Sequence, residues 1–193
     1  MAQSVSDVFL SFQQYLDNEQ DVREEIRLTV RDLEQTARGI LTLLQAIHQQ
    51  SGIATIPEVC EKSKAHFATV REQYKVLKSK IPEGQYYRFH DHWRFVTQRL
   101  CFLVALSIYL EEERLVQRDQ VADMLGLCVE QDKGFHLDLD DYLSGLLMLA
   151  DELAHHKKLS YMAPATPTTD GTYLGEQHAR WPGTPSCGRR LAE

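Results

Sequence analysis

The residues most able to do chemistry are concentrated in one short stretch, QYYRFHDHWRF, at residues 85–95. It interleaves aromatic rings with arginines and histidines, in a chain whose formal net charge is −7. Three kinds of chemistry are open to such a stretch. The histidines could ligate a metal, the rings could fill the core side of a helix, or cations and rings together could bind single-stranded nucleic acid through its phosphates and bases.

The spacing of His90 and His92 argues against a metal site. On a helix that turns ~100° per residue, positions i and i+2 lie about 200° apart, so two imidazoles at this spacing cannot hold one ion. The HExxH spacing of helical zinc sites is absent as well. We expect no metal site in this stretch.

The rings and the cations of the stretch separate into a predicted core and a predicted surface. Tyr86, Phe89 and Trp93 share the apolar seam of the expected helix, so we expect them to be buried. Cations flank both sides of this seam, with Tyr87 outermost; they are Arg88, His92 and Arg99 on one side and His90 and Arg94 on the other. This pattern favours a surface that contacts a nucleic-acid backbone, and an ordinary solvated helix face is the alternative.

Two acidic clusters could supply carboxylates to a divalent metal, as nucleases require. Glu111 to Glu113 is more typical of a solvated helix end. In HLDLDDYLSG, Asp138 is the expected N-cap of a helix, with Asp141 at the position that completes a capping box. We therefore interpret both clusters as structural.

The elements that position these residues are predicted to be helices throughout. Apolar residues recur at steps of three and four over residues 5–16, 22–47, 60–77 and 86–110, and no segment alternates as a strand does. A short helix over 118–125 is expected to end at Gly126. The sequence predicts an all-α bundle of long antiparallel helices.

Composition sets the domain boundaries. We expect a helical domain over residues 1–158 and a disordered tail over residues 159–193, which is rich in Pro and Gly and has no apolar periodicity. Cys60 and Cys101 fall within helical apolar patterns and are expected to be buried thiols. The longest apolar run, residues 101–110, is too short to cross a bilayer, so no membrane partner is expected.

Three stretches of the chain resemble the translin family: residues 4–45, the segment EQYKVLKSKIPEGQYYRFHDHWRFVTQRL, and the helix that contains DYLSG. The resemblance spans residues 4–153. It implies an all-α homo-oligomer, an octamer in the family, that binds single-stranded DNA and RNA. It also implies partnership with translin-associated factor X in an endoribonuclease that acts in RNA processing and RNA interference, in the cytoplasm and nucleus. The family continues after DYLSG with further helices, so we expect this domain to be incomplete at its C-terminal end.

The resemblance also implies site residues. The family's basic nucleic-acid-binding segment corresponds to Arg88, Phe89, His90, Asp91 and His92, and Arg94 of the same stretch is added to it. A second basic segment corresponds to EVCEKSKAHF, where Lys62 and Lys64 supply positive charge opposed by Glu58 and Glu61.

Catalysis is expected to reside in the partner subunit. The partner's catalytic glutamates correspond here to Arg99 and Phe102, neither of which can hold a metal, and only Asp141 matches an acidic position of that site. The resemblance thus implies a subunit without a cofactor of its own, with Mg²⁺ bound in the partner. Two alternatives stay open: an endoribonuclease in its own right that uses Asp141, and a helical scaffold that binds no nucleic acid.

Overall fold

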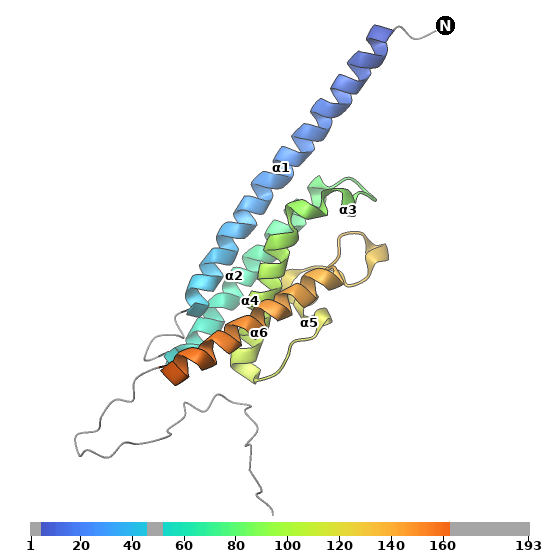
Figure 1. The fold of residues 1–193 in the computed structure, drawn as a ribbon. Helices are drawn as coiled ribbons and strands as arrows, with labels where there is room; N and C mark the ends of the chain where they lie inside the picture. The colour runs from blue at the N-terminus through green and yellow to red at the C-terminus, as the bar shows by residue number, and fades with distance from the viewer. Residues whose placement is uncertain (1–4, 46–51, 163–193) are drawn as a thin grey trace, which may run out of the picture. The chain divides into compact units, whose positions relative to one another are not determined.

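The computed structural model describes residues 5–45 and 52–162, and side chains over 5–45 and 56–155. The α-helices within these ranges are α1 (Val5–Gln45), α2 (Gly52–Lys80), α3 (Tyr86–Phe89), α4 (Arg94–Glu112), α5 (Arg118–Leu125) and α6 (Leu139–Met162) (Figure 1). Two 3₁₀ turns, η2 (His90–His92) and η3 (Gln131–Lys133), complete the order. The all-α prediction is confirmed: the described residues form no strand and a single isolated bridge, between Cys128 and His136.

Helix α1 is longer than the periodicity predicted. We expected a short helix before residue 17 and a second one from Asp21, but the backbone is helical without a break, since DNEQ at 17–20 contains no glycine or proline. Apolar residues recur in one register on both halves of the helix, interrupted by Glu19 and Arg23, and they are buried only in the second half, at Ile26, Val30, Leu33, Ala37, Ile40 and Leu44. In Figure 1 the N-terminal half of α1 extends beyond the other helices. Its apolar residues are therefore exposed.

Helix α2 packs along α1. It begins at Gly52, so Pro57 lies in its second turn. The ring removes one backbone hydrogen bond at that point. The buried face of α2 includes Cys60, Val70 and Leu77, each with no exposed surface, which confirms the core position predicted for Cys60.

The central stretch does not form one continuous helix. We expected helix from residue 86 through residue 110, but α3 ends at Phe89, η2 follows, and α4 leaves at an angle of 73°. The amide of Trp93 donates to the carbonyl of His90 (3.1 Å), closing this tight turn. Tyr86, Phe89 and Trp93 are all buried, as predicted. Among the described residues no single helix is long and apolar enough to cross a membrane. The bent pair formed by residues 86–92 and 94–112 reaches that length and apolar composition only when its two parts are counted together.

Helix α4 is the most buried element, and the first part of α6 crosses it at close range. A Cβ added to Gly145 would lie 2.5 Å from the Cβ of Cys101 and 2.9 Å from the carbonyl oxygen of Gln98. Only glycine permits this approach, because real Cβ atoms do not come so near. Asp141 lies one turn earlier on α6, so the same crossing brings its carboxylate against α4.

The loop between α5 and α6 is fixed by polar contacts with the backbone. Gly126 ends α5 in the left-handed region (φ 72°), as predicted. Nη2 of Arg118 donates to the carbonyls of Val129 (2.7 Å) and Leu137 (2.8 Å). Oδ1 of Asp138 accepts from the amide of Asp140 (3.0 Å), which confirms the predicted cap of α6.

The chain divides into two compact units, residues 1–148 and residues 149–193. In the second unit, α6 continues to Met162, four positions past the predicted boundary at residue 158. The disorder predicted for the rest of the tail falls on residues 163–193, which lie outside the described part of the chain.

Candidate nucleic-acid interface

Four cationic side chains from α1, α3 and η2 lie on one surface, which we call the α1–α3 basic patch: Arg23, Arg27, Arg88 and His92. Nη2 of Arg88 donates to Oε1 of Glu19 on α1 (2.6 Å), and Nη2 of Arg23 binds the same oxygen (2.7 Å). Glu19, with 11% of its side chain exposed, thus holds the two arginines together. A further bond from Arg88 to the hydroxyl of Tyr15 (2.8 Å) fixes α3 to α1.

Phe89 forms the floor of this patch. Its side chain is buried, and the guanidinium groups of Arg23 and Arg88 lie over its ring, 5.8 and 5.6 Å from the centroid. The imidazole of His92 stacks against the same ring, with centroids 6.4 Å apart. Cation–π contacts of this kind hold a guanidinium in place without removing its charge.

The pKa of His92 reports the positive charge around it. Partial burial lowers this pKa below the ordinary 6.5, and the charges of Arg27 and Arg23 lower it further, while the neighbouring Asp91 acts in the opposite direction. Asp91 itself is exposed. His92 is therefore poised to gain a proton when a negative charge approaches the patch.

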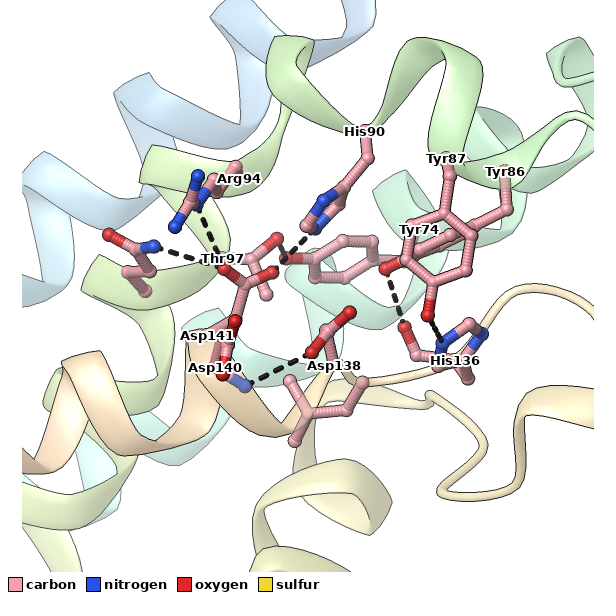
Figure 2. A network of polar contacts seen from close by, with 12 residues as sticks. Tyr74, Tyr86, Tyr87, His90, Arg94, Thr97, His136, Asp138, Asp140 and Asp141 are labelled. Carbon is pink, nitrogen blue, oxygen red and sulfur yellow. Dashed lines mark hydrogen bonds and ion pairs between the residues drawn. The ribbon is translucent and has the colours of Figure 1, made fainter.

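Two more of the predicted cations, His90 and Arg94, turn toward α6 and meet the carboxylate of Asp141 (Figure 2). Nε2 of His90 lies 2.7 Å from Oδ2, Nε2 of Gln98 donates to Oδ1 (3.0 Å), and Nε of Arg94 is 3.8 Å from Oδ1. The predicted division between two sides of the seam is confirmed for Arg88 and His92 on one side and for His90 and Arg94 on the other. His90 retains 12% exposure of its side chain and Arg94 retains 43%.

Asp141 is not the capping residue that the sequence predicted. Its side chain is fully buried, and both of its oxygens bond to residues of η2 and α4. Within the described residues, no group of three or more His, Cys, Asp or Glu side chains is placed to hold a metal ion. The arrangement fits a buried carboxylate that positions His90 and Arg94.

Tyr86 links this buried carboxylate network to the loop before α6. Its ring stacks between two imidazoles, with centroids 5.1 Å from His90 and 4.3 Å from His136. Its hydroxyl donates to the carbonyl of His136 (2.9 Å). Next to it, Tyr87 is exposed as predicted, and its hydroxyl lies 3.2 Å from Nε2 of His136 (Figure 2).

Lys62 and Lys64 lie far from the α1–α3 basic patch. Lys62 is 18 positions before Lys80, the last residue of α2, which corresponds to about 27 Å at ~1.5 Å per residue. Both lysines are paired, Lys62 with Glu58 (2.7 Å) and Lys64 with Glu61 and Glu111 (2.9 Å each). These hydrogen bonds to Glu61 and Glu111 raise the pKa of Lys64.

Sequence reasoning missed Arg23 and Arg27. They alternate with glutamates along α1, a pattern that is typical of any solvated helix face, so no local signal marks them. Gln98 was missed as well, because its partner, Asp141, comes close to it only when α6 packs on α4.

The fold and the patch together define a class: an all-α helical bundle with a cationic, aromatic-floored surface. The model of the Translin family matches residues 21–157, and the chain belongs to the translin family, which confirms the resemblance in its sequence. Over 151 residues it is 56% identical to Translin of Homo sapiens, of Mus musculus and of Bos taurus. Each match covers 78% of this chain and 66% of the relative, so the chain spans slightly less than two thirds of the relatives' length.

Proposed function

We propose that this chain binds single-stranded DNA and RNA through the α1–α3 basic patch. The observation that carries the proposal is the convergence of Arg23, Arg88 and His92 around the ring of Phe89, with Arg27 close enough to act on the charge of His92. Phosphates of a flexible strand are bound by such rows of cations, and membership of the translin family supports the assignment.

The charge of the patch explains how binding would work. Its three arginines are opposed by two glutamates, Glu19 and the half-exposed Glu24, which pairs with Arg27 at 3.5 Å. These pairs leave one positive charge, which the exposed Asp91 beside His92 balances, so the patch becomes net positive when His92 is protonated. The arginines keep 36–53% of their side chains exposed, so a phosphate can compete for guanidinium donors already held in place.

The remaining predicted ligands take different places in this proposal. Arg94 lies outside the patch, on the side that faces Asp141, and the exposed Asp91 lies next to His92. Phe89 and His90 support the surface from beneath, since both are largely buried. Lys62 and Lys64 would form a separate contact at the far end of α2.

We also propose that the chain is a homo-oligomer. The apolar register of α1 is interrupted by Glu19 and Arg23 and resumes in the N-terminal half, where Val5, Phe9, Phe12 and Leu16 are 61–72% exposed. A stripe of this spacing is buried by another helix in most proteins. A second copy of the chain, joined along α1, would supply that cover.

The finer assignment follows the family resemblance. We propose that the chain acts with translin-associated factor X in an endoribonuclease complex, in RNA processing and RNA interference, in the cytoplasm and nucleus. In this proposal Mg²⁺ and its carboxylate ligands belong to the partner. Arg99 and the buried Phe102 occupy the corresponding positions here, which supports a non-catalytic role for this chain.

The salt dependence of binding tests the patch. Each neutralised phosphate contributes ~0.7 to the slope of log affinity against log salt for single strands. Arg27→Ala combined with Arg88→Ala is expected to weaken binding to every single strand tested and to lower this slope by about 1.4. Arg38→Ala is the matched control, because Arg38 is an exposed arginine of α1 outside the patch.

Two results would contradict the proposal. One is a double variant that keeps its helical circular dichroism and binds with unchanged affinity and slope. The other is equal weakening by Arg38→Ala, which would mean that binding depends on overall charge and not on this surface.

A further inference from the structure

A cavity of about 400 Å³ lies beside α3, and no residue of the α1–α3 basic patch lines it. The end of α2, the turn before α3, α3 itself and the loop 131–136 line it, and its walls include Lys78, Glu83, Tyr87, Lys133 and His136. Its volume falls within the range of small-ligand pockets, ~300–1,000 Å³. None of the predicted nucleic-acid ligands lines it.

Tyr87 gives the cavity an unused aromatic face. More than half of its surface is exposed (55%). Its ring contacts with Tyr86, His90 and His136 are all edge or T-shaped, so no ring among the described residues stacks flat on it. Its hydroxyl is tied to Nε2 of His136, which holds the ring in one orientation (Figure 2). A rigid, half-exposed ring of this kind is a platform for a planar ligand.

His136 fixes this platform through its own hydrogen bonds. Nδ1 of His136 lies 2.7 Å from the carbonyl of Gly134, which can only accept, so Nδ1 carries a proton. In the neutral ring Nε2 is then the acceptor for the hydroxyl of Tyr87. The imidazole is buried and stacked on Tyr86, so the exposed ring of Tyr87 is anchored through its hydroxyl to a residue of the core.

The rim of the cavity carries more positive than negative charge. Lys78 and Lys133 oppose Glu83 among the lining residues. Lys133 is held by Glu130 (2.7 Å), and no carboxylate in the described ranges pairs with Lys78. A ligand that joins a planar ring to an anionic group matches this cavity, because its ring can stack on Tyr87 and its anionic group can meet the cationic rim.

We propose that this cavity is a nucleotide pocket, in which one unpaired base of a bound strand stacks on Tyr87 and its phosphate meets Lys78 and Lys133. The inference rests on the proposed single-strand binding. Tyr87 and Arg88 are neighbours on α3, one directed to the cavity and the other to α1. A strand that crosses α3 can therefore place a phosphate on Arg88 and the adjoining base in the pocket.

The test compares two probes of equal length, an oligothymidylate strand and the same strand with every base removed, by fluorescence anisotropy. Stacking on one aromatic side chain is worth an affinity factor of about 5 to 150 per base. Tyr87→Leu is expected to lose roughly that factor for oligothymidylate and to leave the affinity for the abasic strand unchanged. Tyr87→Phe, which keeps the ring, should retain base-dependent binding.

Lys78→Ala tests the rim independently of the ring. It should lower the salt slope for oligothymidylate by about 0.7, whereas Lys75→Ala should leave it unchanged. Lys75 is an exposed lysine one turn earlier on α2 that does not line the cavity. This arm remains informative if Tyr87→Leu fails to fold.

The outcomes separate the two proposals. If the unmodified chain binds neither probe, the proposed function and the pocket are both wrong. If it binds both, and Tyr87→Leu folds but weakens them equally or not at all, the pocket alone is wrong. Equal slopes for the variants Lys78→Ala and Lys75→Ala would likewise remove the phosphate contact at the rim.

Discussion

The cationic side chains of residues 88–94 point in two directions and make different contacts. Arg88 and His92 face α1 and the solvent, whereas His90 and Arg94 are drawn to the buried carboxylate of Asp141. A buried carboxylate is stable only when its oxygens are paired or hydrogen-bonded. Asp141 thus requires His90 and Gln98 as partners, and this need orders the turn that presents Arg88 and His92.

The lowered pKa of His92 predicts how binding depends on pH. In the free chain the lowered pKa means that His92 gains its charge at a lower pH than an ordinary histidine does. A bound phosphate favours the charged ring and raises this pKa, so binding takes up a proton. Affinity for oligothymidylate should therefore rise by roughly two- to tenfold between pH 7.5 and pH 6, measured at constant ionic strength.

The variant His92→Gln should lose most of this pH dependence. His66→Gln is its control, because His66 is an exposed histidine of α2 outside the patch. Identical pH profiles for the unmodified chain and for His92→Gln would show that His92 does not meet the strand.

At the scale of elements, two features place the functional side chains. The bend of 73° between α3 and α4 separates Arg88 from the long core helix and turns it toward α1. The close crossing of α4 by α6 at Gly145 brings Asp141 against η2. Both features depend on packing between helices distant in sequence.

Gly145→Ala tests the crossing of α4 by α6, and Gly39→Ala in α1 serves as the comparison. Gly145→Ala should lower the free energy of unfolding by about 1–3 kcal/mol, because the new methyl group overlaps Cys101 and the backbone of α4. Gly39→Ala in α1 should raise it by about 0.5–1 kcal/mol, since helix propensity improves and no atom lies within 4 Å of the new Cβ. Urea denaturation followed by circular dichroism measures both. A Gly145→Ala variant as stable as Gly39→Ala would mean that α6 does not approach α4 so closely.

At the scale of the whole molecule, the apolar stripe of α1 exceeds what the described chain can cover. Its second half belongs to the core, and its first half is exposed on a protein with net charge −7. An exposed apolar stripe of this length is typical of an assembly surface.

Light scattering tests this surface. The unmodified chain should have a mass of at least twice 22.2 kDa. Phe9→Ser with Phe12→Ser should reduce this mass without loss of helicity, because neither ring is buried within the chain. Leu28→Ser is the control, an exposed apolar residue of α1 that lies off the stripe. A monomeric mass for the unmodified chain, or equal masses for the two variants, would contradict assembly through this stripe.

The features that the sequence determined are local ones. The 118–125 helix and its glycine end, the cap by Asp138, and the burial of Tyr86, Phe89 and Trp93 all depend on residues within about one turn of each other. Helix periodicity and capping are encoded at that range. The division of the cations between two sides of the seam was predictable for the same reason.

Only the tertiary structure decided which distant residues meet. Arg88 and Glu19 are 69 positions apart, and His90 and Asp141 are 51 apart. Their pairing depends on how α1 and α6 pack against the central stretch. No glycine or proline marks the helix break at His90–His92. We attribute this break to the burial of the three rings of Tyr86, Phe89 and Trp93. Lys62 and Lys64 are positively charged like the residues of the patch, but they lie far from it. The sequence gives the charge of each residue, whereas the packing of the helices decides which residues lie close together.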